Sequence, residues 1–214
     1  MLAGALALIL AAPKEAAALS PLPQQTDSRN SSAQQSKPDP ETERLKELDA
    51  LQRAMTAAQN VDPNIERDNL FAILKTAETE DGARFVAQKI WNSWLDAAPD
   101  AGIRKLMDDA LERRRWHDYE GARVILDRVV EAAPAYAEGW NQRAFIFFLQ
   151  EKYDESLVDI EKALALEPRH FGALSGKARI LTNRNEHKDA QAALKLAVDV
   201  YPWIFERKLL RPEE

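Results

Sequence analysis

Cysteine is absent from this sequence, which excludes disulfide bonds, thiolate zinc sites and a cysteine nucleophile. Only three histidines occur in 214 residues, and that leaves little material for acid–base catalysis or metal binding. Basic residues are outnumbered, giving a net charge of -6, which argues against nucleic acid or an anionic membrane surface as a partner. The carboxylates alternate with lysine and arginine, as in Glu161-Lys162, a pattern typical of solvated helix faces.

Glycine is also scarce, and the one glycine-rich segment does not form a catalytic motif. Gly172 and Gly176, followed by Lys177, have three residues between them, whereas a phosphate-binding loop needs four and a preceding strand. Ser175 is displaced by one position from the place that a nucleophile elbow requires. We therefore expect no enzyme activity, no catalytic residue, no cofactor and no metal ion.

The N-terminal segment predicts export. Residues 2–12 are apolar but too few for a spanning helix, and the small residues Ala16-Ala17-Ala18 offer a cleavage site. Residues 1–18 are thus predicted to be a signal peptide and the protein to be periplasmic, although no lysine or arginine precedes the apolar run. Two alternatives remain: a frayed apolar helix of a cytoplasmic protein, or an uncleaved anchor, the one case in which we expect a membrane contact.

Two further segments precede the main body of the chain. Residues 19–40 are rich in proline, serine and glutamine and hold almost no apolar residue after Leu22, so we predict a disordered linker. Residues 41–62 are predicted to form a helix that covers the front of the main body, and the alternative is a free binding helix. Its apolar stripe consists of Leu45, Leu48, Leu51 and Met55.

The main body is organised around the segment 137–170, which contains two helical patterns closed by Pro168. The first pattern has Trp140, Ala144 and Phe147 on one stripe, which we expect to be buried. Each helix is too short to be stable alone, so each needs the other to bury its apolar face. The second stripe consists of Leu157, Ile160, Ala163 and Leu164.

The same pattern repeats with a period of 34 residues. Pro134, Pro168 and Pro202 recur at that interval and define the frames 103–136, 137–170 and 171–204. Small residues recur where the two helices of a pair would cross closely: Ala110, Ala144 and Ala178 in the first helices, and Ala122, Ser156 and Ala190 in the second. A 34-residue helix pair with this tryptophan, these small residues and a closing proline resembles a tetratricopeptide repeat (TPR).

The resemblance implies an all-α fold, in which helix–turn–helix repeats stack into a right-handed solenoid. Phrases such as AEGWNQRA and ALEPRHFGALSG are also similar to uncharacterised exported TPR proteins of alphaproteobacteria. Residues 63–102 are predicted to form a degenerate first repeat of altered packing geometry, because Lys75 and Trp94 stand where small residues are expected. Residues 205–214 are predicted to form a tail or a short capping helix.

TPR solenoids bind peptides or helices in a concave groove, so the resemblance implies such a site here. Positions 2, 5, 9 and 12 of each first helix are expected to face it. The predicted groove residues are Arg104, Met107, Leu111, Arg114, Asn141, Phe145, Phe148, Ser175, Arg179 and Thr182. Phe145 is the leading candidate, since Phe147 is expected to fill the core, although packing against the neighbouring repeat would explain Phe145 equally well.

The family's carboxylate clamp for chaperone C-termini is absent in this register. The places of its lysine, asparagine and arginine residues are taken by Met107, Leu111, Gln142, Gly172 and Gly176.

The resulting hypothesis is an adaptor in the bacterial envelope that binds a peptide or helix of a partner protein in the concave groove. The alternative is a structural subunit of an envelope assembly that uses its ends and leaves the groove empty. In both cases the expected partner is a protein of unknown identity, not a nucleic acid.

Overall fold

The structure, a computed structural model, describes residues 39–56 and 62–211, and shows the side chains of all but 54–56. The predicted signal peptide and nearly all of the predicted linker lie outside these ranges. Within them the chain forms nine α-helices and one short 3₁₀ helix, with no strand. None of these helices combines the length and the apolar character that crossing a bilayer requires.

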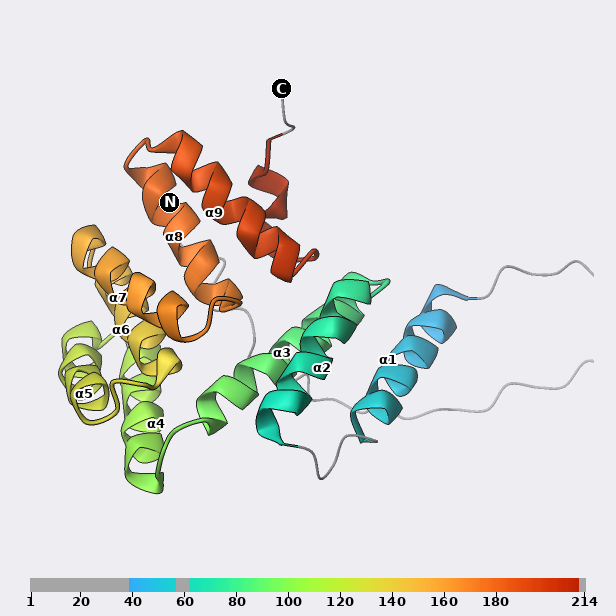
Figure 1. Ribbon diagram of the computed structural model, residues 1–214, viewed down its shortest axis with the longest axis horizontal. Coiled ribbons are helices and arrows are strands. Elements are labelled where there is room, and N and C mark those ends of the chain that lie inside the picture. The colour runs from blue at the N-terminus through green and yellow to red at the C-terminus, as the bar shows by residue number, and fades with distance from the viewer. Residues whose placement is uncertain (1–38, 57–61, 212–214) are drawn as a thin grey trace, which may run out of the picture.

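Three regular helix pairs form the body of the molecule, as the 34-residue period predicts. They are α4 (Ala101–Arg115) with α5 (Tyr119–Ala132), α6 (Ala137–Leu149) with α7 (Tyr153–Leu166), and α8 (Phe171–Asn183) with α9 (His187–Val200). The predicted small residues are buried where paired helices cross, and the Ser156 hydroxyl donates a 2.7 Å hydrogen bond to the Ala144 carbonyl. Neighbouring pairs share core residues, so the three pairs stack into one solenoid (Figure 1).

Local signals set the helix ends. The Asp100 carboxylate caps α4 by accepting a 2.9 Å hydrogen bond from the Ile103 amide. The Asp118 carboxylate caps α5 by accepting a hydrogen bond of the same length from the Gly121 amide. The turns inside the three pairs each contain one non-glycine residue in the left-handed region, with φ near 60° at His117, Glu151 and Asn185. These residues occupy the same repeat position, so the three turns share one geometry.

A fourth pair, α2 (Pro63–Thr76) and α3 (Glu80–Asp96), departs from the solenoid. Its core of Leu70, Leu74 and Trp94 also contains Phe171 and Ala197, from α8 and α9 at the other end of the array. Trp203 anchors the same contact by donating a 2.9 Å hydrogen bond to the Ala77 carbonyl. The degenerate repeat therefore closes back onto the C-terminal pair, instead of only continuing the stack before α4.

The two ends of the described chain each pack on one helix of this arrangement. Helix α1 (Pro40–Thr56) packs on α3, where Leu51 meets the core and Arg44 pairs with Asp81 at 2.8 Å (Figure 1). The predicted packing helix thus lies on the N-terminal helix pair, and Leu45 of its apolar stripe is 60% exposed. At the other end the 3₁₀ helix η1 (Phe205–Leu209) lies against α9.

Candidate binding surface

Two arginines and two phenylalanines form a continuous line across the first helices of the three regular pairs. The Arg114 guanidinium of α4 lies 5.3 Å from the ring centroid of Phe145, and Phe145 stacks on Phe148 within α6 at 6.3 Å. The Arg179 guanidinium of α8 lies 5.4 Å from the Phe148 ring. All four side chains are partly exposed. We call these four residues the arginine–phenylalanine strip.

The repeat spacing explains why the strip exists. Phe145 and Arg179 occupy position 9 of successive repeats, while Arg114 and Phe148 occupy position 12. Residues three apart in a helix lie on the same side, so Phe145 and Phe148 face one direction. Stacking of the pairs then brings the equivalent faces of α4, α6 and α8 side by side. Position 9 of the first regular repeat is Leu111, which is half-buried, and position 12 of the third is Thr182, which is exposed.

The structure corrects the predicted groove at position 5. Met107, Asn141 and Ser175 are buried, at 0%, 6% and 4% exposure, so they do not line an open surface. Arg104 is half-buried and pairs with Asp96 and Asp108. The groove positions near the start of the first helices are thus closed, and those near their ends remain open.

Helix α3 contributes to this closure. The Cβ of any larger residue at position 172 would lie 2.9 Å from the Trp91 ring, so Gly172 permits α3 to approach α8. The Tyr136 hydroxyl donates a 3.0 Å hydrogen bond to the Leu95 carbonyl, which fixes the end of α3 beside the start of α6. Gly172 therefore packs on the N-terminal helix pair.

A second correction concerns Phe147, which was predicted to fill the core. Ile146 is buried at 1% exposure and takes that place, whereas Phe147 is half-buried with the Arg143 guanidinium 5.6 Å from its ring. The expectation that Phe145 faces away from the core does not depend on this assignment, since Phe145 contacts Arg114 and Phe148.

A buried polar cluster, not foreseen from the sequence, lies behind the strip. The Glu138 carboxylate, fully buried, accepts hydrogen bonds from Asn141 at 3.2 Å and Gln142 at 2.5 Å, and lies 2.8 Å from His170 Nε2. His170 Nδ1 accepts from the Ala173 amide at 3.3 Å, so in a neutral ring the proton sits on Nε2 and points to Glu138. Glu138 and His170 are positions 2 and 34 of the same frame 137–170, so only a pairing between the two ends of one frame could have indicated this cluster.

Arg114 connects this cluster to the surface. Its Nη1 donates a 2.5 Å hydrogen bond to the Gln142 Oε1, whose amide nitrogen in turn donates to Glu138. Burial lowers the pKa of the Arg114 guanidinium, the Glu138 carboxylate raises it, and the like charge of Arg115 lowers it. The group stays protonated at neutral pH, so the strip carries a partly desolvated positive charge.

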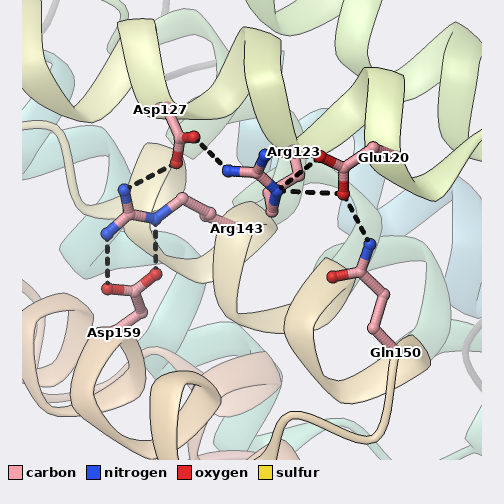
Figure 2. A network of polar contacts seen from close by, with 6 residues as sticks. All are labelled: Glu120, Arg123, Asp127, Arg143, Gln150 and Asp159. Atoms are coloured by element: carbon pink, nitrogen blue, oxygen red, sulfur yellow. Dashed lines mark hydrogen bonds and ion pairs between the residues drawn. The ribbon is translucent and has the colours of Figure 1, made fainter.

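An ion-pair network holds the helices that carry the strip. Arg143 of α6 binds both oxygens of Asp159 on α7, at 2.7 and 2.9 Å, and one oxygen of Asp127 on α5 at 3.0 Å (Figure 2). Asp127 also accepts from Arg123, which pairs with Glu120 (Figure 2). Hydrogen bonding to Asp159 is the main cause that raises the pKa of Arg143, ahead of the opposing effect of burial. Figure 2 shows that this network joins side chains of α5, α6 and α7.

Within 39–56 and 62–211, histidine and carboxylate side chains form no group of three that would hold a metal ion. Ser175 lies in the interior, and its hydroxyl has no hydrogen-bond partner. The arrangement presents aromatic faces and guanidinium groups, which suit a ligand with apolar and anionic parts.

Comparison with known proteins identifies several relatives. A family model described as tetratricopeptide repeat matches residues 137–170. A TPR repeat-containing protein of Rhizobium etli is 39% identical over 143 residues, which cover 65% of this chain and 68% of the relative. Anaphase-promoting complex subunit 7 of Dictyostelium discoideum is 32% identical over 88 residues, which cover 41% of this chain and only 15% of that protein.

Solved structures give weaker likenesses. The TPR2AB domain of yeast Sti1, in a complex with pHSP90, matches with a TM-score of 0.48 and 17% identity, over 79% of this chain and 78% of that one. A crystal structure of MamA matches with a TM-score of 0.44 and 16% identity, over 79% of this chain and 95% of that one. At these scores neither likeness bears on function.

Proposed function

Because the chain belongs to the tetratricopeptide repeat family, we propose that it is a protein-interaction module that holds a peptide or helix of a partner protein on the arginine–phenylalanine strip. The observation that carries this proposal is the continuity of the strip over α4, α6 and α8, with aromatic faces left partly exposed. Aromatic and arginine side chains at the centre of a surface are the residue types that contribute most to binding energy.

Crosslinking in cells, followed by mass spectrometry, tests the proposal on the full chain. The double variant Phe145→Ala/Arg179→Ala removes the ring at the centre of the strip and the charge at one end. We expect at least one crosslinked protein to be lost or to fall about tenfold in yield. The matched control is Trp116→Ala, which removes a 75% exposed aromatic ring at the α4–α5 turn, outside the strip. An unchanged set of crosslinked proteins in the double variant would reject the strip as the binding site.

A second candidate function uses the C-terminal end. Leu196 of α9 and Phe205 and Leu209 of η1 are 55%, 58% and 60% exposed, and α9 contacts η1. This exposed apolar group favours a structural subunit that docks through its end. The variant Phe205→Ser/Leu209→Ser, placed in the same crosslinking experiment, separates the two functions. End docking predicts that this variant loses the crosslinked proteins that Phe145→Ala/Arg179→Ala retains.

We also propose that the protein acts in the bacterial envelope. This rests on the apolar run 2–12 and the small residues at 16–18, which lie outside the described residues. N-terminal sequencing of the protein from an envelope fraction is expected to begin near Leu19. Recovery from the cytosol with Met1 at the N-terminus would contradict export.

A further inference from the structure

Arg114 has more hydrogen-bonding capacity than the protein uses. Its Nη1 donates to the neutral amide oxygen of Gln142 and its plane lies against Phe145. No carboxylate of the described residues lies within ion-pair distance of Arg114, whereas its neighbour Arg113 pairs with Asp118 at 2.6 Å. A guanidinium has five N–H donors, so Arg114 retains donors for a ligand.

The other end of the strip has a loosely held charge as well. Arg179 lies 3.8 Å from the nearest oxygen of Glu206, longer than a direct hydrogen bond, and rests on the Phe148 ring. Two guanidinium groups therefore flank two stacked phenylalanine rings. Arginine is suited to this position because its planar fork binds a carboxylate with two parallel hydrogen bonds while its face stacks on an aromatic ring.

We propose that the ligand of the strip is an acidic segment of a partner protein, with a carboxylate at Arg114 and an apolar side chain on Phe145 and Phe148. The proposal rests on the proposed function of the strip and specifies the chemistry of its partner. Charge complementarity is local, because the whole chain has a net charge of -6 and repels acidic peptides at long range. Any preference for acidic sequences must then originate at a particular site.

Arg114 also has a structural role that the test must separate from binding. Through Gln142 it faces the buried Glu138 carboxylate, so removal of its charge affects the stability of the fold. The variant Arg114→Gln keeps a hydrogen-bond donor near Gln142, and its unfolding by urea measures the structural part. The matched control is Arg113→Gln, which removes an exposed arginine whose charge Asp118 already balances.

The experiment selects a phage library of random 12-residue peptides on the full chain, in parallel on Arg114→Gln, Arg113→Gln and Phe145→Ala. We expect the wild type and Arg113→Gln to select sequences enriched in aspartate and glutamate beside an apolar residue. Arg114→Gln should lose the acidic enrichment, and Phe145→Ala the apolar one. The most enriched peptide, labelled with fluorescein, should bind Arg114→Gln about tenfold more weakly than the wild type, as measured by fluorescence anisotropy. A version of this peptide with asparagine and glutamine in place of aspartate and glutamate should bind the wild type and Arg114→Gln equally.

The outcomes distinguish the two proposals. Selected sequences that depend on Phe145 but show no acidic enrichment, or the same enrichment on Arg114→Gln, overturn the acidic ligand and leave the strip as a binding site. Equal loss of the acidic enrichment on Arg113→Gln also overturns it, because the preference would then follow total charge. If the wild type enriches no sequence, or if Phe145→Ala selects the same sequences as the wild type, both proposals fail.

Discussion

The imidazole of His170 stacks on the indole of Trp94, with ring centroids 3.9 Å apart and planes inclined by 11°. His170 precedes α8 and Trp94 lies in α3, so this contact joins the N-terminal helix pair to the third regular pair. The same imidazole caps α8 and faces Glu138 of α6. His170 thus links α3, α6 and α8.

The first prediction concerns that junction. Trp94→Ala is expected to lower the free energy of unfolding by about 3–5 kcal/mol, because the side chain is 2% exposed and its removal leaves a cavity against Phe171 and His170. Urea unfolding measures the loss, and hydrogen exchange should increase most in α2, α3 and the start of α8. Trp116→Ala is the control and should change stability by less than about 0.5 kcal/mol. Equal losses in both variants would contradict the role given to the junction.

The ion pair between Arg143 and Asp159 gives the second prediction. Their side chains are 17% and 2% exposed, so Arg143→Leu leaves the Asp159 carboxylate buried without its partner and should cost about 3 kcal/mol. Asp159→Leu should cost less, because the Arg143 guanidinium keeps its contact with Asp127. The double variant Arg143→Leu/Asp159→Leu leaves neither charge, and Asp127 keeps its contact with Arg123. We therefore expect the double variant to lose at least about 1 kcal/mol less than the two single losses combined. A simply additive result in urea unfolding would show that the two side chains are not coupled.

The repeats could be predicted from the sequence because they rest on local, periodic features. Small residues at the helix crossings and the prolines that close each frame are visible without any tertiary contact. The closure of α3 onto α8 could not be predicted, because Trp91 and Gly172 belong to segments outside a common period. The burial of Asn141 and Ser175 was also missed, because their place in the repeat does not by itself set the tertiary contacts of these side chains. The burial of Glu138 could not be predicted either, because it depends on the contact with His170 at the far end of the same 34-residue frame.

The third prediction follows from the shared turn geometry. Glu151 has φ of 60°, a region that costs a residue with a Cβ about 1–2 kcal/mol and costs glycine nothing. After allowance for the greater freedom of glycine in the unfolded chain, Glu151→Gly should raise the free energy of unfolding by about 0.5–1 kcal/mol. Asn185→Gly should gain less, because asparagine tolerates this conformation. Thermal unfolding of both glycine variants measures these gains in stability. Glu151→Ala is the control and should gain no stability, because alanine has a Cβ. An equal gain in stability for Glu151→Ala would contradict the assignment to backbone strain.

The last prediction concerns alkaline pH. Burial raises the pKa of the Tyr136 hydroxyl above its usual value near 10, and the Glu138 carboxylate adds to this effect. Above pH 10 the unfolded chain loses the proton that the folded chain retains, so the unfolded state binds fewer protons and the free energy of unfolding falls as pH rises. Tyr136→Phe removes the hydrogen bond to Leu95, at a cost of about 1 kcal/mol at pH 7, but should flatten the fall between pH 10 and 12. Urea unfolding at pH 7, 10 and 12 measures both effects, and an unchanged slope in Tyr136→Phe would show that other groups cause the alkaline loss.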